Sequence, residues 1–157
     1  MVFYRLVSAY EDKVLGLSKS KEVFNYLANR TFPEFIDFVI QQGKKGYGIN
    51  EHWKAAYMHC NFCQIDYNVV GRIEKFEEYL RYIVENTHLS NRISGSNFST
   101  MHSSGIHTIS PTEYELNKKL KVKKYFSSLS KQQMTDLHDI YKIDFELFDY
   151  DFEEYLK

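Results

Sequence analysis

Residues 65–87 read IDYNVVG followed by RIEKFEEYLRYIVENT, and this stretch decides the fold class that the sequence predicts. The segment from Ile65 to Val70 is a short β-prone run, which Gly71 closes. From Arg72 to Thr87 the period of the apolar residues becomes helical. The inward-facing residues of this helix are expected to be Ile73, Phe76, Leu80, Ile83 and Val84. Because a strand, a glycine and a helix in this order form a βα unit, we expect an α/β fold.

A second helix is predicted upstream of this unit. Thr31 and Glu34 have the spacing of a capping box, and Pro33 lies in the first turn, where its missing N–H costs little. An apolar stripe follows up to Gln42, and Gly43 is expected to end the helix.

The remaining segments follow the same logic. Residues 2–15 have helical spacing, whereas residues 89–113 are rich in Ser, Asn and His and predict a loop. Ser130 and Gln133 form another capping box, so a helix is expected to run from there to about residue 148, with the residues 149–157 packing back on it. Its apolar face is made of Met134, Leu137, Tyr141, Phe145 and Phe148.

Composition and charge narrow the class of protein. The chain has 157 residues, of which 43% are apolar and 26% charged, as is ordinary for one folded domain. Its 13 Tyr and 12 Phe suit either a core with amphipathic edges or the stacking of a sugar or a purine. A net charge of -1 gives no overall field for nucleic acid, so we expect no nucleic-acid partner and only local binding of anions. No apolar run approaches the roughly 20 residues of a membrane span.

Two cysteines form a lone CxxC motif, Cys60-Asn61-Phe62-Cys63. A structural zinc site needs four ligands, so this pair is half a site, which His59, His52 or the loop histidines would have to complete. A redox motif would open a helix after a strand, whereas this pair precedes the predicted strand. A disulfide across the short loop and two free thiols are the other possibilities.

Other motifs are few. The triplets Asn29-Arg30-Thr31 and Asn97-Phe98-Ser99 permit glycosylation in a secretory compartment. No G-x-x-x-x-G-K-[ST] loop and no G-x-S-x-G motif is present, so spacing alone indicates neither a nucleoside triphosphate site nor a serine hydrolase.

Residues 3–13 read FYRLVSAYEDK and resemble the 3′-phosphate-binding motif of the Golgi membrane-bound carbohydrate sulfotransferases, typically RDPFxRLVSAYxxK. Phe3, the residues 5–10 and Lys13 match this motif in register. Met1-Val2 stand where the family has Asp-Pro, and the first Arg of the motif has no counterpart.

Two further blocks carry the same resemblance. His52-Trp53, Cys60-x-x-Cys63 and Val70-Gly71 are similar to the family's His-Trp, Cys-x-Pro-Cys and Ile-Gly-Lys-x-Glu block, with Phe62 in place of the Pro and Arg72 in place of the Lys. Residues 125–150 resemble the family's C-terminal helix. The match is nearest to the chondroitin, dermatan and HNK-1 type branch.

The resemblance implies a fold and a place in the cell. The fold is a partial P-loop-like sulfotransferase fold of the α/β class, helix-rich, with the N-terminal part of the parallel sheet missing. Residues 1–157 would be the C-terminal part of a single sulfotransferase domain, beginning inside the 3′-phosphate-binding motif. The full protein would be a type II Golgi membrane protein with its anchor upstream and its catalytic part in the lumen.

The resemblance also implies a donor, an acceptor and site residues. The donor is 3′-phosphoadenosine 5′-phosphosulfate (PAPS), and the acceptor is a hydroxyl of a glycan, with N-acetylgalactosamine of a chondroitin or dermatan type as the leading choice. Ser8 matches the serine that hydrogen-bonds the 3′-phosphate, where a helix N-terminus would also favour an anion, and Arg5 would assist it. His52 is the candidate for acceptor or base contact, with a structural role beside Trp53 as the alternative.

Three expectations complete the interpretation. An oxidising lumen favours a disulfide between Cys60 and Cys63 with no metal. The chain alone is expected to be inactive, and the missing strands are expected to leave Phe3, Leu6 and Val69 exposed. The alternatives are a non-catalytic descendant that binds a glycan or a partner, and a helical zinc-binding interaction domain.

Overall fold

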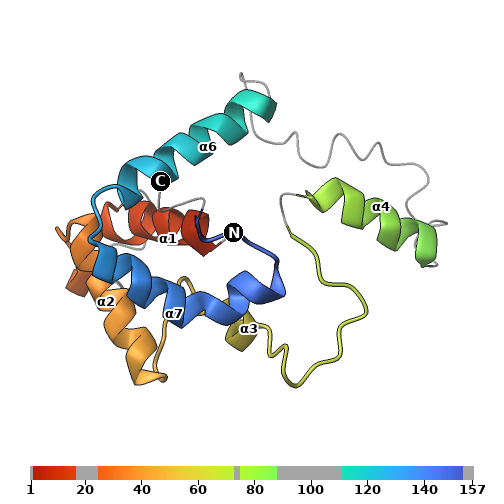
Figure 1. Cartoon of the computed structure of the whole chain (residues 1–157), viewed down its shortest axis with the longest axis horizontal. Coiled ribbons are helices and arrows are strands. Elements are labelled where there is room, and N and C mark those ends of the chain that lie inside the picture. Colours follow the sequence, from red (N-terminus) through yellow and green to blue (C-terminus); the bar gives the residue numbers. More distant parts are fainter. Residues whose placement is uncertain (1, 17–24, 73–74, 88–110, 154–157) are drawn as a thin grey trace. The chain divides into compact units, whose positions relative to one another are not determined.

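The computed structural model describes residues 2–16, 25–72, 75–87 and 111–153 (Figure 1). The chain divides into two compact units, one made of Met1–Asn68 with Lys118–Lys157 and the other of Val69–Asn117. All regular structure in the described residues is helical. The predicted helix-rich character is therefore confirmed, whereas the expected parallel sheet has no strand within the described part of the chain.

The first helix begins the core of the larger unit. α1 (Val2–Ala9) continues into a π-helix at Tyr10–Val14, so the predicted helical segment is confirmed with a change of winding at its end. Phe3 and Leu6 are fully buried, and the prediction that they would be exposed is wrong. The Phe3 ring lies 4.3 Å from that of Phe126 and 5.4 Å from that of Phe145, centroid to centroid. Helices from distant parts of the chain cover the face that was assigned to a sheet.

The second long helix starts as predicted and ends later. α2 (Phe32–Lys45) has Thr31 as its N-cap, and the capping box with Glu34 is present. Gly43 does not end the helix, which is a correction. The helix stops at Gly46, where φ is +73° and glycine avoids the steric cost of a left-handed residue. A Cβ on Gly43 would lie 2.8 Å from Ile140 Cδ1, so this glycine instead allows a close approach to α7.

The last long helix, α7, contributes Ile140 to the contact at Gly43. α7 (Lys131–Leu147) begins at Ser130, whose predicted capping box with Gln133 is present. The side chain of Gln133 also donates to Pro33 O at 3.1 Å and to Asp37 Oδ1 at 2.7 Å. The capping residue of α7 therefore also ties the first turns of the two helices together.

The described part of the segment after α7, residues 149–153, packs back on the core, as predicted. Phe152 is half-buried, and its ring lies 4.4 Å from that of His138 and 5.6 Å from that of Phe145. Phe145 belongs to the buried face of α7, on which Met134, Leu137 and Tyr141 also lie, as the apolar pattern predicted.

One helix was not expected from the sequence. α6 (Pro111–Phe126) occupies a segment whose first residues were assigned to a loop. Its apolar residues do not gather in one stripe: Leu116 and Leu120 are each 55% exposed, whereas Val122 and Phe126 are buried. Without a continuous apolar face, the helical period was too weak to recognise.

The predicted strand at residues 65–70 is wrong. None of these residues is in a strand, and Ile65 and Tyr67 are 47% and 41% exposed. A strand needs a neighbouring strand for its backbone N–H and C=O groups, and the described residues offer none. The helix that follows is confirmed as α4 (Phe76–Asn86), in the smaller unit. Its Leu80, Ile83 and Val84 are half-buried, and Glu78 and Arg81 are exposed.

The short elements complete the larger unit. A 3-10 turn lies at Asn25–Leu27, and α3 (Ala56–His59) is a single helical turn. Among the described residues, no helix has the length and apolar character needed to cross a membrane.

The N-cap of α2 predicts a pH dependence of stability. Hydrogen bonds from the Thr31 hydroxyl and backbone N–H lower the pKa of Glu34. A carboxyl whose pKa is lowered on folding stabilises the fold above its unfolded pKa, and this contribution is lost as the pH falls through the folded pKa. We expect the urea midpoint to fall between pH 7 and about pH 3, and to fall less in Glu34→Gln.

The control for this measurement is Glu51→Gln, at an exposed carboxyl in a turn. This variant should keep the acid sensitivity of the wild type. An unchanged pH profile in Glu34→Gln would contradict a role for the capping carboxylate.

Candidate functional site

Ser8 lies on the outer face of α1. Its neighbours Leu6 and Val7 are buried, whereas Ser8 is exposed, and its side chain has no hydrogen bond within the described part of the chain. The predicted position on the first helix is confirmed. However, Ser8 is the last residue but one of α1, so the expected contribution of a helix N-terminus is wrong. The hydroxyl is available to a ligand, but the dipole of α1 does not favour an anion there.

The residues after Ser8 adopt an uncommon winding. In the π-helix at Tyr10–Val14, the Leu15 N–H donates to Tyr10 O at 3.1 Å. Such segments are rare and often lie at functional sites. Lys13, which matches the family motif, is 12% exposed and its Nζ lies 2.6 Å from Asp12 Oδ2. The motif's lysine is therefore already paired with a carboxylate.

Arg5 lies one turn before Ser8 and is held from two sides. Its Nη2 donates to Lys54 O at 2.6 Å and stands 4.0 Å from Asp144 Oδ2. The side chain is 32% exposed. Its Nε is buried and has no hydrogen-bond partner among the described residues. Arg5 thus combines a structural contact at Nη2 with other N–H donors that make no hydrogen bond among the described residues, on the helix that carries Ser8.

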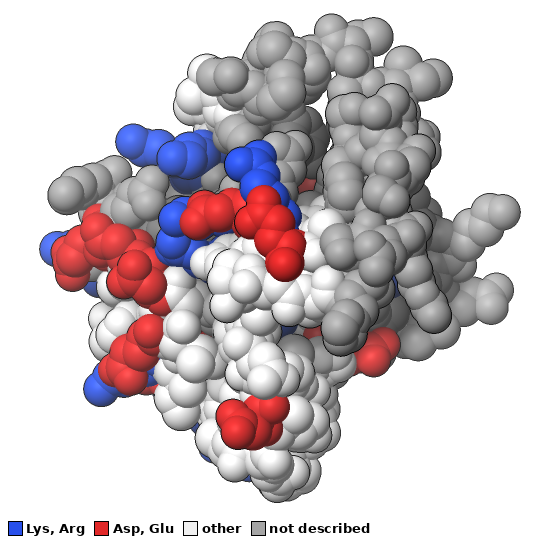
Figure 2. Space-filling model, turned by 90° about the vertical axis from the view of Figure 1, so that its right-hand side faces the viewer, with Lys and Arg blue, Asp and Glu red and all other residues white. Residues whose placement is uncertain are grey.

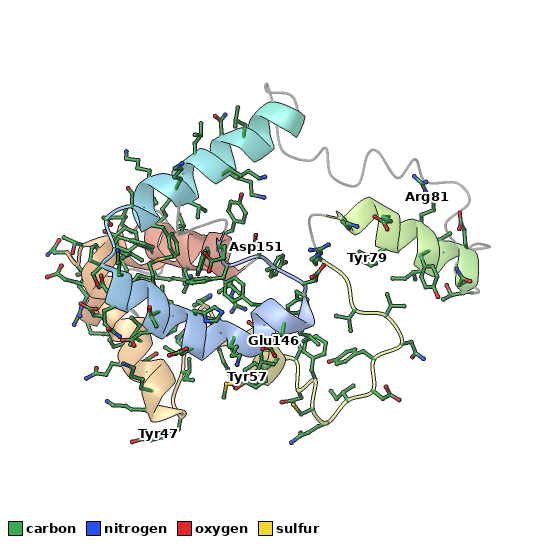
Figure 3. The ribbon with its side chains drawn as sticks, viewed as in Figure 1. Tyr47, Tyr57, Tyr79, Arg81, Glu146 and Asp151 are labelled. Carbon is green, nitrogen blue, oxygen red and sulfur yellow. The ribbon has the colours of Figure 1, made fainter. Side chains whose placement is uncertain are left out.

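Asp144 is the residue that the sequence analysis missed. It is fully buried on α7, and its two carboxylate oxygens accept the N–H groups of Ala56 and Tyr57 at 2.7 and 2.8 Å. These are the first N–H groups of α3, which have no partner inside that helix (Figure 3 labels Tyr57). Asp144 falls on the apolar stripe of α7, and a carboxylate on a buried face is the signal that could have identified it.

The turn before α3 carries His52 and Trp53. His52 is half-buried, its backbone N–H donates to Asn50 Oδ1 at 3.0 Å, and its ring lies 6.4 Å from that of Trp53. Trp53 is fully buried, and its Nε1 donates to Gln42 Oε1 at 2.7 Å. Arg5 reaches this turn through Lys54 O, so the structure connects the Arg5–Ser8 helix with the turn of His52.

A buried tyrosine fixes the same turn from the other side. The Tyr141 hydroxyl donates to Trp53 O. Burial raises the pKa of Tyr141, Asp144 raises it further, and Arg5 acts in the opposite direction. Tyr141 therefore stays a neutral donor, and the backbone of the turn is bonded to both α1 and α7.

The cysteines and the triplet at Asn29 have no part in these contacts. Both thiols are free in the structure, Cys60 half-buried and Cys63 exposed, so the disulfide stays a prediction. No group of three His, Cys, Asp or Glu side chains suited to a metal ion is found among the described residues. Asn29 is exposed in a turn, and Asn97 lies outside the described residues.

A cavity of about 300 Å³ lies between α2, α7 and α3. Trp53, Tyr57 and Tyr141 contribute to its wall, and Lys44 and Asp136 form an ion pair beside it at 2.8 Å. Neither Ser8, Arg5 nor His52 lines this cavity. On the face shown in Figure 2, acidic and basic side chains lie next to one another among the described residues.

Comparisons with known proteins agree with the sequence motifs. Residues 3–151 match the Sulfotransferase family. Carbohydrate sulfotransferase 11 of Danio rerio is 29% identical over 99% of this chain and 46% of its own length. The protein of the same name in Mus musculus is 30% identical over 80% of this chain and 32% of its own length. Carbohydrate sulfotransferase 8 of Mus musculus is 26% identical over 94% of this chain and 37% of its own length.

The chain thus spans less than half the length of these curated relatives. None of the solved structures matches it.

The contacts of Asp144 predict a large effect on stability. Replacement by alanine removes the acceptor of two N–H groups and leaves Arg5 without its carboxylate. We expect Asp144→Ala to lower the free energy of unfolding by about 2–4 kcal/mol. Asp144→Asn should lose less, because its amide oxygen keeps one acceptor. Urea denaturation followed by circular dichroism measures both changes.

Asp139→Ala is the matched control on the same helix. The Asp139 side chain is 71% exposed, and its removal should change stability by no more than about 0.5 kcal/mol. Equal losses at the two positions would show that Asp144 does not hold α3 and Arg5 in place.

Proposed function

The chain belongs to the sulfotransferase family, and on that premise we propose that it is part of a carbohydrate sulfotransferase. The proposed reaction transfers a sulfuryl group from PAPS to a hydroxyl of a glycan, and an N-acetylgalactosamine acceptor of the chondroitin or dermatan type is the leading choice. The observation that carries the proposal is the family match over residues 3–151, which begins in the motif that presents Ser8. The names of the relatives, which are carbohydrate sulfotransferases, support the acceptor class.

Ser8 and Arg5 are proposed to hold the 3′-phosphate of the donor. An exposed hydroxyl on the outer face of α1 and the partly exposed guanidinium of Arg5 are donors of the kind that phosphate oxygens accept. The guanidinium is partly exposed and keeps its position through Lys54 O and Asp144. A fixed donor loses little conformational entropy when it binds a ligand.

The transfer step needs more than a phosphate contact. The acceptor oxygen bonds to sulfur, the bond from sulfur to the bridging phosphate oxygen breaks, adenosine 3′,5′-bisphosphate leaves, and the hydroxyl proton passes to a base. Cations must neutralise the charge that develops on the oxygens. His52 is the residue of this chain that we propose for acceptor or base contact, because its turn is bonded to the helix of Ser8.

The cation clamp is proposed to come from parts of the enzyme that these residues do not include. The 157 residues contain no phosphate-binding loop with a lysine, and the relatives are more than twice as long as the portion matched here. We therefore propose that the chain alone does not catalyse the transfer.

The proposed location is the lumenal side of the Golgi membrane, with membrane attachment through a segment outside these residues. In that oxidising compartment Cys60 and Cys63 are proposed to pair. Cys60 is the C-cap residue of α3, and Cys63 lies in the turn that follows. This turn would have to change conformation for the two sulfur atoms to bond.

A non-catalytic descendant of the fold is the second candidate. The observation that favours it is that both cationic side chains of the motif already make contacts within the protein. Arg5 donates to Lys54 O, and Lys13 pairs with Asp12. A protein that used these groups only for structure would keep the fold and bind a glycan or a partner without transferring sulfate.

The test compares this chain with a longer protein that also carries the residues encoded upstream in the gene. Both are assayed with labelled PAPS and desulfated chondroitin. We expect sulfation only by the extended protein, because a few neutral hydrogen bonds of roughly 0.5–1.5 kcal/mol each do not clamp a sulfuryl group. In the extended protein Ser8→Ala should raise KM for PAPS with unchanged thermal stability, since the hydroxyl has no structural partner among the described residues.

Lys131→Ala, at an exposed position in the first turn of α7, is the control that should leave KM unchanged. Activity in the short chain would show that the catalytic groups lie within it. Inactivity of both proteins, with Ser8→Ala neutral for nucleotide binding, would favour the non-catalytic candidate.

A further inference from the structure

A rigid turn presents Asn29 at the surface between the first two long helices. Leu27 is fully buried, and the Arg30 N–H donates to its carbonyl at 3.3 Å. The Tyr10 hydroxyl donates to Arg30 O at 2.9 Å. The backbone is therefore bonded on both sides of the turn. Asn29 itself is exposed and has φ +62°, a left-handed conformation that asparagine tolerates better than most residues.

Asn29 is the first residue of an Asn-x-Thr triplet, the acceptor sequence for N-linked glycans. In the folded chain the Thr31 hydroxyl donates to Glu34 Oε2 at 2.6 Å and serves the N-cap of α2. The same hydroxyl completes the acceptor triplet in an unfolded chain. The two uses are thus separated in time: modification belongs to the nascent chain, and capping to the folded one.

An aromatic ring lies three residues before the asparagine. Tyr26 is 53% exposed, so part of its side chain is accessible. Its ring is braced against Phe38 at 5.7 Å, and the Arg30 guanidinium lies 5.5 Å from the centre of the same Phe38 ring. The negative face of an aromatic ring attracts the polarised C–H groups on one side of a sugar ring.

We propose that Asn29 carries an N-linked glycan and that the first sugar of this glycan packs on the ring of Tyr26. The inference rests on the proposed function only for its compartment, the secretory lumen. In the modification Asn29 Nδ2 bonds to C1 of N-acetylglucosamine in a lipid diphosphate-linked oligosaccharide. The bond from C1 to the diphosphate oxygen breaks, the lipid diphosphate leaves, and the amide loses one proton to a base.

The first experiment tests attachment. The full chain, with a cleavable signal peptide and Asn97→Gln to remove the other triplet, is secreted from mammalian cells and treated with peptide N-glycosidase. We expect one mobility shift, which Asn29→Gln abolishes. Thr31→Ser should keep the shift. Thr31→Asn should abolish it while preserving an N-cap, because asparagine caps helices as well as threonine does and its amide can still donate to the Glu34 carboxylate.

Thr31→Asn separates a lost acceptor from a lost fold, since its side chain can still cap the helix. A wild-type protein without a shift, or a shift that persists in Asn29→Gln, would overturn the assignment of the glycan. Sulfation by the extended enzyme is measured separately, so failure here and failure of the proposed activity are distinguishable.

The second experiment tests the contact with Tyr26. Melting temperatures are compared for the secreted, glycosylated Asn97→Gln chain before and after removal of the glycan from the folded protein by peptide N-glycosidase. We expect the glycan to raise Tm by about 2–4 °C, a shift of the size that one modest contact gives a chain of this length. In Tyr26→Ala the glycan should give no increase. An equal increase with and without the Tyr26 ring would show that the sugar does not pack on it.

Discussion

One buried carboxylate holds the larger unit together. Asp144 on α7 accepts the first two N–H groups of α3 and stands 4.0 Å from the guanidinium of Arg5 on α1. Removed from water, such a charge is stable only when its oxygens are satisfied, and the two N–H groups and Arg5 satisfy them. Three helices from distant parts of the sequence are thereby fixed relative to one another, and the turn of His52 and Trp53 lies between them.

The contact with Asp144 also determines how Arg5, in the motif that this chain shares with its family, can meet a ligand. The Arg5 position is set by Asp144 and Lys54 through Nη2, so a contact with a ligand has to come from the partly exposed remainder of the guanidinium. Ser8, one turn further along α1, has no such commitment among the described residues. The two residues of the motif therefore differ in their surroundings. Arg5 joins the helix to the core, whereas Ser8 faces outward, available to a ligand.

Local chemistry made the helix starts predictable. The pairs Thr31 with Glu34 and Ser130 with Gln133 satisfy orphan N–H groups within one turn, so their spacing alone identifies them. Features that depend on a distant partner were not predictable in this way. Gly43 looked like a stop, but it is the point where Ile140 of α7 approaches, and residues 65–70 had β-prone side chains without a neighbouring strand to pair with.

The sequence by itself determined the helix caps, the apolar faces of α2 and α7, and the register of the motif that contains Arg5 and Ser8. Each of these features depends on residues that are close together in the chain. Only the tertiary structure decided that Phe3 and Leu6 are buried by helices and that Asp144 supports Arg5. The physical reason is that burial and ion pairing depend on which distant segment arrives at a surface, and residue spacing carries no information about that.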